Sequence, residues 1–377
     1  MNRTETHLFI LWNKALEDTG KIIAGIEKEF SVLSVDDIYW DNKKFFTNFC
    51  RFYTNSKAII FWKLLHCGRS PFRLIIVRDD KPEYTERKTN AGVELVNTHM
   101  FDCKKRFRSM LKNGHLIHGS NSVAEFTCNY MMLTGTPPPF QKFESMAKWN
   151  GEIGKITPVV PGEKPWKDLA ELFDFLREFK PFLVMRNFEN LPDSCQLGPH
   201  SDIDIMTAAP AEFCRLLNLK RASRIPLRAV WRVRVADSYV NMDIRSPGDG
   251  YYPDKMAESM IESRIVNGNG IPVPGGKDYF YSLLYHALIH KYALSEEYRE
   301  RLVKMARALS IFPQEKEDEK TFLLRLLHDY MKDNAYSFVE PRDLTVNFNN
   351  DAAGDGKLSL SLLRNMKNIL RRILKKG

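Results

Sequence analysis

The sequence predicts an α+β protein with two domains, a helical region and a basic tail. The chain has 377 residues, which is more than a single hydrophobic core usually organises. Strand-like apolar runs alternate with amphipathic helical runs in both halves. A stretch rich in proline and glycine separates the halves. We therefore expect an N-terminal domain, a linker, a second domain, a helical domain and a tail, at residues 1–135, 136–165, 166–255, 256–347 and 348–377.

Each expected element follows from its apolar pattern. In the N-terminal domain we expect three strands and one amphipathic helix, at 7–12, 31–40 and 72–79 for the strands and 22–30 for the helix. In the second domain we expect two helices, at 167–179 and 210–219, and strands at 182–187, in the run SDIDI, and near 228–235 and 239–245. After PVPGGKD the pattern is helical to about residue 333.

Composition limits the class of protein. No run of 18 apolar residues occurs, and the polar start MNRTETHLF is unlike a signal peptide. The six cysteines show no C-x-x-C spacing, which argues against a zinc knuckle or a disulfide framework and favours a reducing cytoplasm. Of the net charge of +9, seven basic residues lie beyond residue 356 with no acidic ones, which leaves +2 for the rest of the chain. We therefore do not expect a DNA-binding groove.

The tail KLSLSLLRNMKNILRRILKK has the pattern of a basic amphipathic helix. Its leucine and isoleucine side chains fall near one helical face, and its arginines and lysines fall elsewhere. Such a helix suits an anionic membrane surface, where each nearby basic side chain contributes about 1 kcal/mol. The alternative is a terminal helix that packs on the body of the protein with a solvated basic face.

Three carboxylates carry most of the functional information. Asp202 and Asp204 alternate in the run HSDIDI, so on a strand they project to the same face. Asp243 follows 39 residues after Asp204 in another strand-like run, and we expect it on an adjacent strand. Converging carboxylates repel one another unless a divalent cation neutralises them, and Mg²⁺ suits such an oxygen site. This pattern predicts phosphoryl or nucleotidyl transfer assisted by Mg²⁺ (or Mn²⁺).

The element order and the run MRNFENLP ahead of SDIDI resemble the polymerase-β-like nucleotidyltransferase superfamily. This run looks similar to one found in uncharacterised nucleotidyltransferase-like proteins that are often linked to bacterial surface polysaccharides. The resemblance implies that Asp202, Asp204 and Asp243 hold two metal ions roughly 3.5–4 Å apart, and that Asp243 helps to deprotonate the acceptor hydroxyl. The Gly-Ser pair that this family uses to hold phosphate is absent. We expect four other residues to contact the phosphates: Arg186, Asn187, His200 and Ser201.

Two segments after the aspartates add candidate substrate contacts. The run RSPGDGYYP, directly after Asp243, is expected to form a loop at the mouth of the site. Its Arg245, Tyr251 and Tyr252 could contact a nucleotide or sugar, and packing is the alternative for the tyrosines. The run KDYFYSLLYHALIHK places His286 and His290 one helical turn apart. These histidines either contact phosphate at the cleft or are buried and bonded to neighbours.

The N-terminal run GHLIHGSNS resembles the signature N-x-x-H-G-S-D-S of nucleoside diphosphate kinases. The resemblance extends over most of residues 7–135 and implies a ferredoxin-like core. It makes His118 the histidine that accepts a phosphate, and it makes Arg106 and Arg108, in the run KKRFR, candidate phosphate contacts. A phosphohistidine needs one ring nitrogen held by a hydrogen bond so that the other is nucleophilic.

The kinase pattern is degenerate. The family's Lys-Pro-Asp after the first strand is replaced by Trp12-Asn13-Lys14, and its supporting glutamate by Asn129. Because the lysine contacts phosphate, diphosphate kinase activity is not expected to be retained in full. The alternatives are phosphorylation of His118 during turnover, a retained nucleotide or phosphosugar pocket, or an assembly surface.

Together these observations predict a cytoplasmic, Mg²⁺-dependent nucleotidyltransferase with a degenerate diphosphate-kinase-like N-terminal domain. Its partners would be a nucleotide donor, a small or glycan acceptor, the inner face of a membrane through the tail, and further copies of itself. Surface polysaccharide biosynthesis is the setting that the resemblance implies. Two alternatives stay open: an antiviral or toxin-type nucleotidyltransferase that modifies tRNA or protein, and a catalytically inactive nucleotide-binding scaffold.

Overall fold

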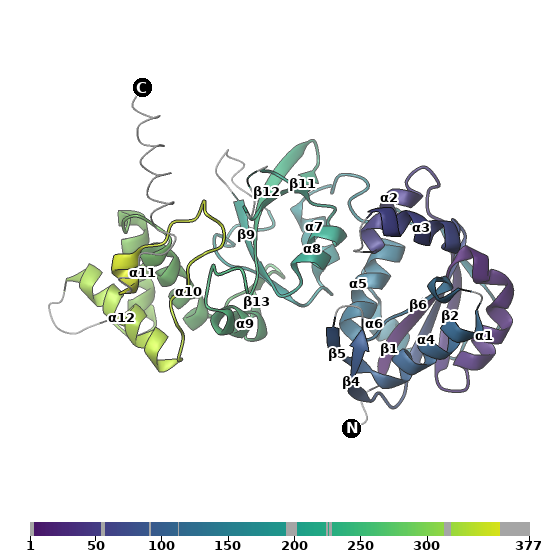
Figure 1. Ribbon diagram of the computed structural model, residues 1–377. Coiled ribbons are helices and arrows are strands. Elements are labelled where there is room, and N and C mark those ends of the chain that lie inside the picture. The colour runs from purple at the N-terminus through teal and green to yellow at the C-terminus, as the bar shows by residue number, and fades with distance from the viewer. Residues whose placement is uncertain are drawn as a thin grey trace. The chain divides into compact units, whose positions relative to one another are not determined.

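The computed structural model describes residues 4–53, 57–89, 92–111, 113–193, 202–223, 225, 228–312 and 318–354. It is a mixed α+β structure whose chain divides into two compact units (Figure 1). Unit 1 consists of residues 1–166 together with two later segments, 175–180 and 214–218. Unit 2 consists of residues 167–174, 181–213 and 219–377. The chain therefore passes between the units several times.

Unit 1 is built on a five-stranded sheet with the order β6-β1-β3-β2-β7. Neighbouring strands are antiparallel except β7, which runs parallel to β2. The middle of β1 is continuously apolar and fully buried, because both faces of the sheet are covered. The strands are β1 (Glu5–Leu11), β2 (Ser31–Ile38), β3 (Phe72–Asp79), β6 (Ile117–Gly119) and β7 (Gly154–Ile156).

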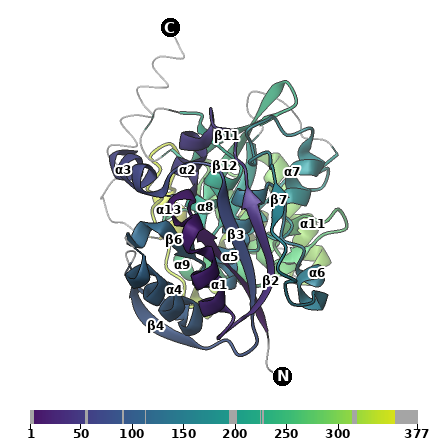
Figure 2. The same ribbon diagram turned by 90° about the vertical axis from the view of Figure 1, so that its right-hand side faces the viewer.

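Helices cover the two faces of this sheet. On one face lie α1 (Thr19–Ile26) and α4 (Thr98–Met110), whose Ile22 and Phe107 share a core with Phe9 of β1 (Figure 2). On the opposite face lies α5 (Val123–Thr134), which contacts β1. The remaining elements of unit 1 are η1 (Asn13–Asp18), α2 (Phe45–Phe52), α3 (Lys57–Cys67), the hairpin β4 (Tyr84–Thr89) and β5 (Gly92–Asn97), η2 (Gly114–Leu116) and α6 (Phe140–Ser145).

The segment expected to be a linker, 136–165, instead belongs to unit 1. It contains α6, whose Phe143 packs against Phe126 of α5, and β7, which extends the sheet beside β2. Its proline and glycine residues shape the connections between these elements. At Gly135, for example, φ is +78°, and a Cβ would lie 2.2 Å from the carbonyl oxygen of Val159.

Unit 2 contains a second five-stranded sheet, with the order β10-β11-β12-β9-β8. The pair β12 and β9 is parallel, and the other pairs are antiparallel. The strands are β8 (Phe182–Val184), β9 (Asp202–Thr207), β10 (Lys220–Arg221), β11 (Val230–Val235) and β12 (Ser238–Arg245). The helix α7 (Leu169–Leu176) precedes β8 along the chain, and α8 (Pro210–Leu216) follows β9.

A helical region completes unit 2. Its central helix is α10 (Gly276–Ile289), in which every residue from Phe280 to Ile289 is buried. These side chains share one core with Leu183 of β8 and Met206 of β9, so the helical region is packed on the sheet. The other elements are α9 (Asp254–Glu262), β13 (Ile265–Val266), β14 (Pro272–Val273), α11 (Glu296–Ala308), α12 (Glu319–Asp333) and α13 (Asn350–Ala353).

Some expected features lie outside the described residues. These are His200 and Ser201, which were candidate phosphate contacts, and the basic tail from residue 355 onward. Among the described residues, no helix is both long enough and apolar enough to span a membrane.

Candidate functional site

The paired aspartates and the third aspartate lie on neighbouring strands of unit 2. In the register of β9 and β12, Asp204 is opposite Asp243 and Asp202 is opposite Asn241. Because side chains alternate along a strand, all three carboxylates project from one face of the sheet. The intervening residues Ile203 and Ile205 are buried on the other face, which holds the strand in this register. The expectation that Asp243 lies on the strand beside the aspartate pair is confirmed.

Two arginines pair with two of these carboxylates. Arg186, which follows β8, donates from Nη2 to Oδ1 of Asp204 at 2.6 Å, and both side chains are buried. Arg245, at the end of β12, donates from Nη2 to Oδ2 of Asp243 at 2.9 Å. The same nitrogen lies 3.2 Å from Oδ2 of Asp343, a buried residue that the sequence did not single out. In this arrangement, no three His, Cys, Asp or Glu side chains of the described residues converge as a metal-binding group.

The chemistry of the carboxylates nevertheless fits a divalent cation. Burial raises the pKa of Asp204 to about 6; Arg186 opposes this shift, and the nearby charges of Asp243 and Asp202 add to it. Oδ1 of Asp243 is buried and forms an ion pair with Nε of Arg245 at 2.9 Å. A desolvated carboxylate among other carboxylates favours a hard cation such as Mg²⁺ or Mn²⁺.

Tyr251 connects the arginine to the helical region. Its hydroxyl accepts a hydrogen bond from Nη2 of Arg186 at 3.1 Å and is hydrogen-bonded to Nδ1 of His286 at 2.8 Å. Burial lowers the pKa of His286 well below the usual value, so its imidazole is neutral. Tyr252 is oriented differently: its hydroxyl donates to the carbonyl of Ser282 at 3.0 Å in the helical core, as the packing alternative for this tyrosine predicts.

His290 differs from His286. It is buried, and its ring lies against Tyr251 with the ring centroids 4.2 Å apart. Among the residues that the structure describes, neither ring nitrogen of His290 has a side-chain hydrogen-bond partner, and the backbone of Tyr251 interacts with the ring. Burial lowers its pKa well below the usual value, so it is neutral and presents one donor and one acceptor. Of the two histidines, His290 is the one with unused hydrogen-bonding capacity.

These side chains surround a cavity of about 830 Å³. Its lining includes nine residues that the sequence singled out: Arg186, Asn187, Asp202, Asp204, Asp243, Arg245, Tyr251, His286 and His290. It also includes residues that the sequence analysis missed, among them Arg228, Lys291 and Thr345. The position of Lys291 directly after His290 is a signal that could have been used. Thr345 lies in an irregular segment without periodicity, so no pattern identifies it.

The second predicted site, in unit 1, centres on His118 of β6. Nδ2 of Asn129 lies 2.9 Å from Nε2 of His118, and Oε1 of Glu125 lies 3.6 Å from the same nitrogen. The side chain is partly buried, and burial lowers its pKa well below the usual value, with Lys104, Lys63 and Arg108 adding to this effect. Burial also lowers the pKa of Lys63 and of Lys104 to about 8. Such a concentration of cations around a histidine is typical of an anion-binding site.

The two arginines expected to bind phosphate beside His118 have different environments. Arg108 is near enough to lower the pKa of the histidine. Arg106 forms an ion pair with Glu29, and the pKa of His118 shows no effect of its charge. Arg106 and Arg108 are two residues apart on α4, so their side chains point in different directions, which explains this difference.

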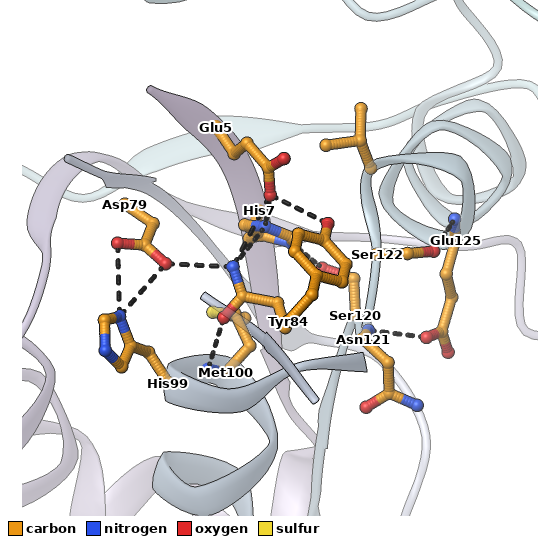
Figure 3. A network of polar contacts seen from close by, with 12 residues as sticks. Glu5, His7, Asp79, Tyr84, His99, Met100, Ser120, Asn121, Ser122 and Glu125 are labelled. Carbon is orange, nitrogen blue, oxygen red and sulfur yellow. Dashed lines mark hydrogen bonds and ion pairs between the residues drawn. The ribbon is translucent and has the colours of Figure 1, made fainter. Parts of the chain in front are cut away.

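A buried polar network holds the turn after His118 (Figure 3). Oγ of Ser120 accepts from the backbone N–H of Leu8 at 3.2 Å and lies 3.1 Å from Nδ1 of His7. Nε2 of His7 in turn lies 3.2 Å from a carboxylate oxygen of Glu5. These bonds tie β6 to β1, so the strand that carries His118 is held firmly in the sheet.

Comparison of the chain with protein-family models and with curated proteins finds no match. The functional argument therefore rests on the two sites themselves. The site of unit 2 joins carboxylates, guanidinium groups and a neutral histidine around one cavity. The site of unit 1 joins a histidine with several cations and the carboxylate of Glu125.

Proposed function

We propose that unit 2 is a Mg²⁺- or Mn²⁺-dependent nucleotidyltransferase. It transfers NMP, or a phosphate-linked group, from a nucleotide donor to a hydroxyl group of a small molecule or glycan. The observation that carries this proposal is the register of β9 and β12, which brings Asp202, Asp204 and Asp243 to one face beside the cavity. Arg186, Arg228 and Lys291, which also line that cavity, supply positive charge for phosphate groups.

We also propose a specific fold for each of the two units. A mixed sheet with its carboxylates on two adjacent parallel strands supports a polymerase-β-like arrangement for unit 2. In unit 1, the order β6-β1-β3-β2 with antiparallel neighbours supports a ferredoxin-like, diphosphate-kinase-like core. Polysaccharide biosynthesis as the setting, and action at the cytoplasmic face, rest on the resemblance carried by MRNFENLP and SDIDI.

The residues that line the cavity would have different roles in catalysis and binding. Asp202, Asp204 and Asp243 would hold the metal, which supplies neutralisation of phosphate charge and alignment of the reacting oxygens. Asp243 would also accept the proton of the acceptor hydroxyl. Arg186 would orient a phosphate, because its Nη1 is buried and, within the described residues, has no hydrogen-bond partner. His290 would donate to, or accept from, a hydroxyl or phosphate oxygen of the substrate.

For unit 1 we propose an anion-binding role around His118, with a nucleotide or phosphosugar as the ligand. The cations Lys63, Lys104 and Arg108 support this proposal, since each lowers the pKa of the histidine. Phosphorylation of His118 itself needs a nucleophilic ring nitrogen. The contact with Asn129 engages Nε2 of His118 and therefore favours binding over phosphoryl transfer.

The alternative of a catalytically inactive nucleotide-binding scaffold is favoured by one observation. Asp204 and Asp243 are each paired with an arginine, so their charges are already compensated. Metal binding and turnover therefore have to be measured directly and separately.

The test is ³¹P NMR of the full-length protein with Mg²⁺, each NTP in turn, and a pool of phosphosugars and alditol phosphates. Pyrophosphate that forms with one NTP, and is lost in Asp204→Asn and Asp243→Asn, is the expected result. The matched control is Asp237→Asn, which makes the same change at an exposed position in the turn between β11 and β12.

The other outcomes separate the alternatives. NDP without pyrophosphate, lost in His118→Ala, would move the chemistry to unit 1. Binding of Mn²⁺ and nucleotide without turnover under any condition would support the scaffold. A protein that binds neither Mn²⁺ nor nucleotide would overturn the proposal for unit 2.

A further inference from the structure

The helix α3 is apolar on two faces, although the fold of unit 1 covers only one. Its inner face consists of Ile60, Leu64 and Cys67, which are buried. Its outer face carries four large apolar side chains with high exposed fractions: Ile59 at 56%, Phe61 at 50%, Trp62 at 64% and Leu65 at 46%. A helix that is apolar all round is normally buried on all sides. The outer face of α3 therefore calls for an apolar partner.

Aromatic packing extends this outer face to the neighbouring helix. Phe61 contacts Phe46 of α2, with ring centroids 6.4 Å apart, and Trp62 contacts Phe61, with centroids 6.2 Å apart. Three aromatic rings are thus adjacent on the hairpin of α2 and α3. A contiguous exposed apolar patch of this kind usually marks an interaction site.

Basic residues are frequent in the sequence around this patch. From residue 42 to residue 78 it contains eight lysines and arginines and no aspartate or glutamate, and three of these cations, Lys44, Arg73 and Arg78, pair with carboxylates from outside this stretch. Lys14 reaches the end of α3, where its Nζ donates to the carbonyl of Leu65 at 2.8 Å. Arg69 follows α3, and its Nη1 donates to the carbonyl of Asn42 at 3.3 Å, which places it beside the exposed Lys43. Cationic groups therefore border the C-terminal end of the patch.

We propose that this face of unit 1, formed by Phe46, Ile59, Phe61, Trp62 and Leu65 with its basic border, docks on an anionic lipid bilayer. The apolar side chains enter the boundary between headgroups and acyl chains, and the basic side chains contact anionic headgroups. Tryptophan suits this boundary because its large apolar ring carries a polar N–H. This contact is distinct from the basic tail and independent of the nucleotidyltransferase proposal.

Two other occupants fit the patch less well. A second copy of the chain would form an isologous interface, in which the basic borders of both copies face each other and repel. A single-stranded nucleic acid would stack on aromatic rings, but Ile59 and Leu65 offer it no stacking surface. An anionic bilayer satisfies both the apolar patch and the charge.

The test is co-sedimentation of the full-length protein with vesicles of phosphatidylcholine mixed with phosphatidylglycerol, and with vesicles of phosphatidylcholine alone, without nucleotide. We expect binding to the mixed vesicles that weakens with added salt, and little binding to the neutral ones. The double variant Phe61→Ser/Trp62→Ser should bind the mixed vesicles roughly tenfold or more weakly, because two large apolar side chains are lost from the contact.

The matched control is Val93→Ser/Leu95→Ser, which removes two exposed apolar side chains from β5 in the same unit and should leave binding unchanged. Tryptophan fluorescence adds a local readout: mixed vesicles should shift the emission of the wild type to shorter wavelength, and Trp62→Phe should lose that shift while still binding.

Equal binding by wild type and Phe61→Ser/Trp62→Ser would overturn the proposal and leave the tail as the contact. Lipid-independent dimers, abolished by the same double variant in analytical ultracentrifugation, would replace the bilayer with a second copy. Binding to neither kind of vesicle would also overturn it.

Discussion

Acidification should weaken metal binding at the site of unit 2, with a midpoint near pH 6. A carboxylate must be deprotonated to bind a metal, and the pKa of Asp204 is raised from 3.8 to about 6, mainly by burial. The ionised fraction of Asp204 is then about nine tenths at pH 7 and about one tenth at pH 5. The affinity for Mn²⁺ should therefore fall about tenfold over this interval. An aspartate with an unshifted pKa would stay ionised, and the affinity would hardly change.

The assay is a Mn²⁺ titration of the full-length protein, followed by the electron paramagnetic resonance of free Mn²⁺ at constant ionic strength. Because Arg186 lowers the pKa of Asp204, Arg186→Gln should move the midpoint to higher pH. Asp237→Asn, in the exposed turn, should match the wild type. Equal Mn²⁺ affinity at both ends of the pH range would refute either the raised pKa of Asp204 or its role as a ligand.

Three substitutions test other parts of the structure. Arg245→Met should lower the free energy of unfolding in urea by about 3–5 kcal/mol, because buried Asp343 loses its guanidinium partner; an unchanged midpoint would contradict this role. His290→Phe keeps the ring volume, so it should preserve stability while weakening nucleotide binding in calorimetry, and tight binding by this variant would remove His290 from the substrate contacts. Ser120→Ala should cost about 1–3 kcal/mol in the same urea assay, since the backbone N–H of buried Leu8 loses its acceptor, and full stability would show that another acceptor replaces it.

The sequence predicted the core of the site because its signals are local. The alternation in SDIDI predicts a shared face for Asp202 and Asp204, and the apolar run around Asp243 predicts a strand. Strand pairing then brings Asp243 opposite Asp204. The mixed α+β class follows from the same alternation of periodicities.

Other features of the site depend on tertiary contacts that no local pattern encodes. Tyr251 and Tyr252 are consecutive in an irregular loop, so the sequence could not tell which one faces the cavity and which one packs on Ser282. Asp343 reaches Arg245 from 98 residues away. Segment 136–165 was expected to be a linker because it is rich in proline and glycine. These residues are common in linkers and also in the turns of a folded unit, and here they lie in the turns of unit 1.

The interleaving of the two units limits how this protein can be divided. Arg51 of α2 donates to the carbonyl of Arg215 at 2.7 Å, and Arg215 donates back to the carbonyl of Phe52 at 2.8 Å, so a late segment is bound into unit 1. A fragment that stops at residue 166 would lose this segment together with residues 175–180. Neither unit is therefore a continuous stretch of the chain, so no single cut in the sequence separates the two units without dividing one of them.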